Sequence, residues 1–157
     1  MAFTGAKSNT YEDALLNYIF RGTTSPATGT NLYISIFTGD GTTAITSPDG
    51  ADAVNLYAFE PTGVGMDGYQ RIQVSTVFGT TASAGSISND ALIDFGTSIG
   101  ATAWGTVTGF FIGSQAVQGN QGLATEILYY GLFDTPKTVT SGDSVRITAT
   151  NLTISES

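Results

Sequence analysis

The side chains of this sequence with the clearest capacity for chemistry are carboxylates, and four of them lie in one long predicted loop. This loop, Gly39–Met66, contains Asp40, Asp49, Asp52 and Glu60. Oxygen ligands in Asp- and Gly-rich turns suit a hard cation such as Ca²⁺, but the spacing differs from the D-x-D-x-D-G pattern of calcium-binding loops. Solvated acidic turns are the preferred interpretation, and no metal site is predicted.

Catalysis has few other candidates, because the chain has no histidine and no cysteine. Their absence removes Ser-His-Asp and Cys-His mechanisms and most zinc and transition-metal sites. A carboxylate pair of the kind that hydrolyses glycosides is conceivable among the 13 acidic residues, but no spacing singles one out. The sequence therefore predicts a non-enzymatic protein with no catalytic residues and no cofactor.

The charge distribution argues against direct binding to nucleic acid or to a membrane. The net charge is −8, and the five basic residues are scattered singly along the chain. Nucleic acids and anionic membrane surfaces are both bound through clustered Lys and Arg. No signal peptide or membrane-spanning run is recognised, and the lack of cysteine favours a chain made in a reducing cytosol.

Aromatic residues make up 11% of the chain and have two interpretations. They could stack on sugar rings or fill a β-rich core, where aromatic side chains are favoured. The candidates for sugar contact are Tyr57, Phe59, Tyr69, Tyr129 and Tyr130.

The only tryptophan, Trp104, lies in the stretch ATAWGTVTGFFIG, Ala101–Gly113, which has no His, Cys or acidic residue. We predict that Trp104 packs in the core, with Gly105 and Gly109 allowing a close approach of the backbone. A contact between subunits is the alternative.

One helix is predicted near the N-terminus, in the segment NTYEDALLNYIFRG. Asn9 and Glu12 fit a capping box, and Gly22 supplies the stop. An apolar face must be buried, most simply against the end or edge of a sheet. This face comprises Tyr11, Leu15, Tyr18 and Ile19, widened by Leu16 and Phe20.

Residues 1–8, before the helix, are predicted to be an arm with Phe3 as its candidate anchor. The arm is expected to be disordered or to order on a neighbouring subunit.

The rest of the chain shows period-two patterns between turn-rich segments, which predicts an all-β fold. The expected class is a β-sandwich of jelly-roll type with one short N-terminal α-helix, formed by residues 9–157 as a single domain carrying the long loop 39–66. The predicted strands are Leu32–Thr38, Tyr69–Phe78, Ala91–Phe95, Thr106–Ile112, Glu126–Phe133, and Asp143–Ser155 with a bulge near Thr150–Asn151.

From about Leu15 to Ile154 the sequence resembles a family of small virion proteins of tailed bacteriophages. The most distinctive stretches are Ala103–Thr108 (AWGTVT) and Leu132–Val139 (LFDTPKTV). Members are often described as tail-fibre proteins, and some related proteins are capsid decoration, or cement, proteins.

The resemblance implies a structural virion protein, most simply a cement protein that binds and stabilises the assembled shell. Its partners would be the major capsid protein and two further copies of itself in a homotrimer, on the capsid surface of a particle assembled in the host cytoplasm. The alternatives are a tail or fibre component that contacts host glycans and a carbohydrate-binding module.

The expected interface combines the arm, the helix face and the apolar loop segment VNLYAF, Val54–Phe59. Apolar segments that stay dry only against a partner mark interfaces. The candidate interface residues are Phe3, Tyr11, Leu15, Tyr18, Val54, Leu56, Tyr57 and Phe59.

Overall fold

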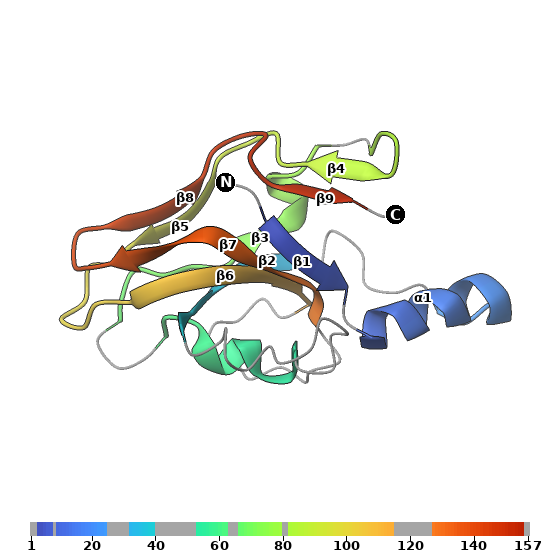
Figure 1. Cartoon of the computed structure of the whole chain (residues 1–157), viewed down its shortest axis with the longest axis horizontal. Coiled ribbons are helices and arrows are strands. Elements are labelled where there is room, and N and C mark those ends of the chain that lie inside the picture. The colour runs from blue at the N-terminus through green and yellow to red at the C-terminus, as the bar shows by residue number, and fades with distance from the viewer. Residues whose placement is uncertain are drawn as a thin grey trace.

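A five-stranded antiparallel sheet forms the centre of the molecule (Figure 1). The computed structural model describes residues 3–7, 9–24, 32–39, 53–62, 66–79, 82–114 and 127–155. The strands of the sheet, in spatial order, are β1 (Phe3–Lys7), β7 (Ile127–Val139), β6 (Gly105–Gly113), β2 (Tyr33–Thr38) and β3 (Ile72–Gln73). The predicted all-β fold with one short N-terminal helix is confirmed.

Two small sheets cover one face of this central sheet, and a short helix covers the other (Figure 1). The small sheets pair β5 (Ile93–Thr97) with β8 (Ser144–Ile147), and β4 (Ser86–Ser88) with β9 (Thr153–Ser155). The opposite face carries the 3₁₀ helix η2 (Ala53–Phe59), and a second 3₁₀ helix, η3 (Val74–Thr76), follows β3. The jelly-roll topology stays a prediction, because the described strands form sheets of five, two and two rather than two equal sheets.

The main core lies between the central sheet and the two small sheets, and Trp104 is buried in it with 1% of its surface exposed. The Trp104 ring meets the Tyr69 ring edge to face at 5.8 Å, and its Nε1 donates a hydrogen bond to the Asp67 carbonyl at 3.2 Å. The predicted core role of Trp104 is therefore confirmed.

Gly109 allows two strands and an aromatic ring to approach closely, as the sequence predicted; the same prediction for Gly105 is wrong, because nothing lies within 4 Å of its Cβ position and its φ of 83° is what favours glycine there. A Cβ at this position would lie 2.3 Å from the Gly131 carbonyl oxygen and 2.4 Å from Phe37 Cζ. The pairing of β6 with β7 shifts register between Val107 and Gly109. The missing side chain thus lets β7 and the Phe37 ring close over β6.

A second apolar cluster on the opposite face of the sheet packs against η2. Its buried members are Phe37, Leu56, Tyr57, Phe111, Ile127 and Tyr130. Because both faces of the sheet are covered, β2 is buried at consecutive positions and not only at alternate ones.

The predicted C-terminal strand is two strands, β8 and β9, in different sheets. Between them Thr150 takes a positive φ of 66°, which turns the chain. The buried Asn89 side chain holds both sides of the turn: Nδ2 donates to the Thr148 and Ala91 carbonyls, each at 2.9 Å, and Oδ1 accepts from Leu152 N at 2.8 Å. At the position of the predicted bulge the chain therefore passes from one sheet to another, and the Asn89 side chain, which is far away in the sequence, stabilises this turn.

The N-terminal segment differs from the expected arm, because Phe3–Lys7 forms strand β1 at the edge of the central sheet. It runs antiparallel to β7, with Phe3 opposite Phe133 and Lys7 opposite Tyr129. The strand β7 is paired with β6 on its other side, so β1 satisfies backbone groups that β7 would otherwise leave open.

The predicted strand Tyr69–Phe78 is shorter than expected. It contains β3, an isolated bridge at Tyr69 and the 3₁₀ helix η3.

Candidate functional site

The helix α1 (Asn9–Arg21) extends from one end of the central sheet, away from the body of the molecule (Figure 1). Glu12 in its first turn and Arg21 in its last turn complement the helix dipole. Gly22 follows with a φ of 65°, the left-handed conformation that ends helices. The predicted helix and its C-terminal stop are confirmed.

One side of α1 rests on the body of the same chain. The Tyr11 ring lies 5.3 Å from the Tyr129 ring of β7, and Ala14 and Leu15 are half-buried. Tyr11 and Leu15, two of the predicted interface residues, therefore attach the helix to its own sheet.

The opposite side of α1 is apolar and exposed. Leu16, Ile19 and Phe20 have 53%, 58% and 78% of their surface exposed. Their spacing of i, i+3 and i+4 places them on one stripe of the helix surface. We call these three residues the outward stripe.

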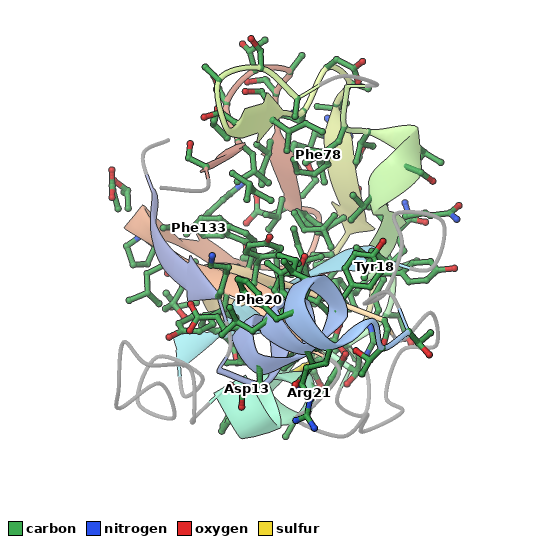
Figure 2. The ribbon with its side chains drawn as sticks, turned by 90° about the vertical axis from the view of Figure 1, so that its right-hand side faces the viewer. Asp13, Tyr18, Phe20, Arg21, Phe78 and Phe133 are labelled. Atoms are coloured by element: carbon green, nitrogen blue, oxygen red, sulfur yellow. The ribbon has the colours of Figure 1, made fainter. Side chains whose placement is uncertain are left out.

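The free end of the helix carries further exposed side chains. Tyr18, another predicted interface residue, is 45% exposed, and it lies with Phe20 and Arg21 around this end in Figure 2. The single apolar face expected from the sequence is thus divided between a half-buried inner side and an exposed outer side. The sequence predicts Ile19 on the buried face, with Leu16 and Phe20 widening it; in the structure all three side chains are exposed.

The predicted apolar loop interface is mostly internal. Leu56 is fully buried and Tyr57 is 3% exposed, both in the cluster between η2 and the central sheet. Phe59 packs against the same cluster and is partly buried. The expectation that this segment stays dry only against a partner therefore needs correction for Leu56 and Tyr57, which the chain's own sheet covers. The side chains of Phe3 and Val54 lie outside the described residues.

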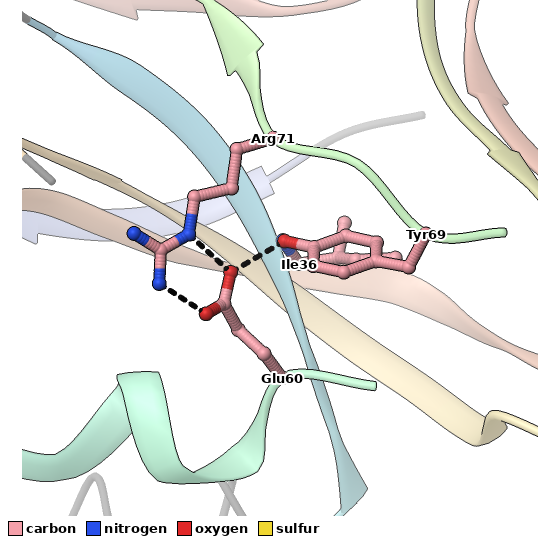
Figure 3. Close-up of polar contacts among 4 residues, drawn as sticks. All are labelled: Ile36, Glu60, Tyr69 and Arg71. Carbon is pink, nitrogen blue, oxygen red and sulfur yellow. Dashed lines mark hydrogen bonds and ion pairs between the residues drawn. The ribbon is translucent and has the colours of Figure 1, made fainter. Parts of the chain in front are cut away.

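A buried polar cluster joins the segment after η2 to the central sheet (Figure 3). Arg71 Nε donates to Glu60 Oε1 at 2.8 Å, and Arg71 Nη2 donates to Glu60 Oε2. The Tyr69 hydroxyl donates to Glu60 Oε1 at 2.5 Å and accepts a hydrogen bond from Ile36 N at 3.3 Å. The Arg71 guanidinium also lies 4.9 Å from the centre of the Tyr57 ring.

Burial and the contacts with Glu60 together set the pKa values of Tyr69 and Arg71. The side chains of Arg71 and Glu60 are 1% and 0% exposed. Burial raises the pKa of Tyr69 well above its usual value, and the charge and hydrogen bond of Glu60 raise it further. Burial alone lowers the pKa of Arg71, but its hydrogen bond and ion pair with Glu60 outweigh this, so the net shift is upward.

The polar groups of this cluster form their hydrogen bonds within the chain. Both carboxylate oxygens of Glu60 accept hydrogen bonds from the same chain, and the Tyr69 hydroxyl is both donor and acceptor. The arrangement positions residues 53–62 against the sheet and presents no open acid or base to a substrate. No local sequence pattern signals the pair, because Glu60 and Arg71 are 11 residues apart on irregular segments.

The other site candidates that fall in the described part of the chain do not come together on the surface. Tyr57, Tyr69 and Tyr130 are buried, and Tyr129 contacts Tyr11, so the proposed sugar-stacking residues form no exposed platform. Among the described residues no group of three His, Cys, Asp or Glu side chains could hold a metal ion. Asp40, Asp49 and Asp52 lie outside these residues.

The described part of the chain contains no helix that is both long enough and apolar enough to cross a membrane.

Comparison with known families gives one match over nearly the whole chain. The family model described as podophage GP4 fiber I protein gp80 matches residues 6–155. The chain belongs to this family. No curated protein sequence matches it.

Membership of this family confirms the predicted resemblance to tailed-phage virion proteins. The matched range includes α1, both small sheets and the central sheet apart from the first three residues of β1. The outward stripe and the buried cluster both lie within the matched range, and of these two features the stripe is the exposed one.

Proposed function

We propose that this chain is a structural subunit of the fibre apparatus of a tailed phage, held in the particle by contacts through α1. The observation that carries the proposal is the match to a fibre protein family over residues 6–155, in a chain whose one described α-helix leaves an apolar stripe uncovered. Exposed apolar stripes of this kind mark sites of protein association. The role is architectural and involves no catalytic step.

A capsid cement protein is the second candidate, and the layered body with one protruding helix favours it. Such a shape suits a module that sits on a larger surface (Figure 1). In this role the chain would bind the major capsid protein as a homotrimer on the outside of the shell. Because it would bind the assembled shell and not separated subunits, its binding free energy would stabilise the shell.

Contact with host glycans is less well supported than either structural role. A sugar-binding site needs exposed aromatic rings next to polar groups. The described aromatic residues of the proposed platform are instead buried, partly buried or, for Tyr129, packed against the Tyr11 ring.

Immunogold labelling of purified virions, with antibodies raised against the recombinant chain, tests the proposal. Label confined to the tail region, with a low copy number in quantitative mass spectrometry, supports the fibre role. Label spread over the capsid, with hundreds of copies, supports the cement role and overturns the fibre role. Absence of the chain from purified particles overturns both.

A further inference from the structure

The outward stripe of α1 is the largest uncovered apolar feature on a described helix. Leu16, Ile19 and Phe20 together expose roughly 350 Å² of apolar side chain, which is as large as the biggest patch on many soluble monomers. The inner side of the same helix is occupied by contacts with β7. A helix that is apolar on opposite sides is stable when both sides are buried.

We propose that the outward stripe inserts into an apolar groove, rimmed by Lys or Arg side chains, on a different protein of the virion. The inference rests on the proposed function, because it supplies the partner chemistry of a virion subunit. Anchors at i, i+3 and i+4 are the pattern by which an amphipathic helix occupies a groove. The inner side of the first half of the helix rests on β7, but its second half projects from the body, so that a groove can enclose the stripe and the exposed flanks there (Figures 1 and 2).

Charge sets the character of the groove. Glu12 and Asp13 lie one turn before Leu16, at i−4 and i−3, so they flank the start of the stripe; both are exposed. Arg21 lies on the far side of the helix from the centre of the stripe, and the chain carries a net charge of −8. Basic residues around the groove would meet these acids, which gives orientation and faster association.

A second copy of this chain is a poorer occupant for two reasons. Side-by-side pairing in parallel would place Glu12 and Asp13 of one copy near those of the other, and like charges repel. Stripe against stripe also buries at most roughly 350 Å² from each copy, whereas a stable interface buries about 800 Å² per partner. A groove overcomes the second limit because it encloses the helix flanks as well.

Incorporation into particles tests the stripe. The full chain, as wild type or as Phe20→Asp, is supplied to cells infected by phage that lack it, and the copies per purified particle are measured by mass spectrometry. The matched control is Ile99→Asp, which changes a body residue of similar exposure, 71% against 78%. We expect Phe20→Asp to reduce incorporation at least about tenfold, since a buried Phe is lost, while Ile99→Asp is incorporated as wild type.

The outcomes separate the two proposals. If wild-type chain is absent from particles, the proposed function fails. If wild type is incorporated and Phe20→Asp is incorporated equally, the docking inference alone fails. Circular dichroism melting of purified Phe20→Asp should show a melting temperature lowered by no more than about 4 °C, the effect of an acid in the last turn of the helix, because Phe20 is exposed; a larger loss would mean that the chain covers its own stripe, and would overturn the inference.

Photo-crosslinking identifies the occupant directly. A benzoylphenylalanine at position 20 should form an adduct with a different virion protein, at a peptide flanked by Lys or Arg, whereas the same residue at position 99 should not. An adduct with a second copy of this chain, or within the chain, would overturn the proposal. Neutralising the flank with Glu12→Gln plus Asp13→Asn should lower incorporation about threefold, while Asp134→Asn, an exposed acid on β7, should leave it unchanged. An equal effect of the double variant and of Asp134→Asn would contradict the proposed Lys or Arg rim of the groove.

Discussion

Replacing Glu60 with Gln should destabilise the fold strongly, because it leaves the Arg71 guanidinium buried without a charge partner. Both side chains are almost fully buried, and the pair is bidentate. Two charges about 4 Å apart attract by about 4 kcal/mol in a partly polar environment, and removing one partner of a buried pair costs about 3–5 kcal/mol. For a chain of this length such a loss lowers the melting temperature by about 10 °C.

A double replacement separates the charge effect from simple loss of contacts. Glu60→Met with Arg71→Met should regain most of the lost stability, since apolar residues of similar volume often replace a buried ion pair at little cost. The Tyr69 hydroxyl would then lack its acceptor, so the double variant should remain about 1 kcal/mol less stable than wild type.

The assay is urea unfolding followed by the fluorescence of Trp104, the only tryptophan, whose ring lies 5.8 Å from that of Tyr69. Arg146→Gln is the control, because it breaks the exposed Arg146–Asp94 pair, whose side chains are 53% and 34% exposed. Exposed pairs of this kind contribute about 1 kcal/mol or less. The reasoning is refuted if Glu60→Gln costs no more than Arg146→Gln, or if the double variant is as unstable as Glu60→Gln.

Three further predictions concern the core. Gly109→Ala should lower the free energy of unfolding by about 3 kcal/mol in thermal melts, since the new Cβ would overlap the Gly131 carbonyl. Gly105→Ala should lower it by only about 1 kcal/mol, because Gly105 has a φ of 83° but open space around it. Asn89→Ala should lower the unfolding free energy by about 3 kcal/mol, because it removes three buried hydrogen bonds, to the Ala91 and Thr148 carbonyls and from Leu152 N, and leaves a cavity; a change below about 1 kcal/mol would contradict this. The pKa of Tyr69 is higher in the folded state than in the unfolded state. The free energy of unfolding should therefore keep its full value below a pH of about 10 and fall above it, and Tyr69→Phe should flatten this fall when urea unfolding is measured against pH. An unchanged fall in the Tyr69→Phe variant would contradict the prediction.

Helix α1 and strands β2 and β6 could be predicted from the sequence because the residue patterns that specify them lie within each segment. The dipole residues Glu12 and Arg21 and the stop Gly22 lie close together in the sequence, and the predicted segment agrees with the observed helix, Asn9–Arg21, although Asn9, predicted as the cap, is already its first residue. The alternation in Leu32–Thr38 and Thr106–Ile112 likewise identified β2 and β6. The absence of His and Cys and the glycine-spaced stretch around Trp104 directed the interpretation away from catalysis and toward packing.

Contacts between segments that are distant in the sequence could not be predicted from it. The pairing of Phe3–Lys7 with β7, the separation of β8 from β9 by Asn89, and the Glu60–Arg71 pair all join segments with no shared local pattern. In each case the sequence predicts a loop or a tail, and the role of the residue depends on a backbone or side chain that folding places beside it.

The sequence by itself determined that this chain is β-rich, acidic and poor in reactive side chains, and that its first helix is apolar on much of its surface. Only the tertiary structure decided which part of that surface is available to another molecule. Helical periodicity groups Tyr11, Leu15, Tyr18 and Ile19 together, but burial depends on where β7 lies, and Tyr129 covers Tyr11 while Leu16, Ile19 and Phe20 remain exposed. The physical reason is that amphipathicity is a property of the helix, whereas exposure is a property of the packed molecule.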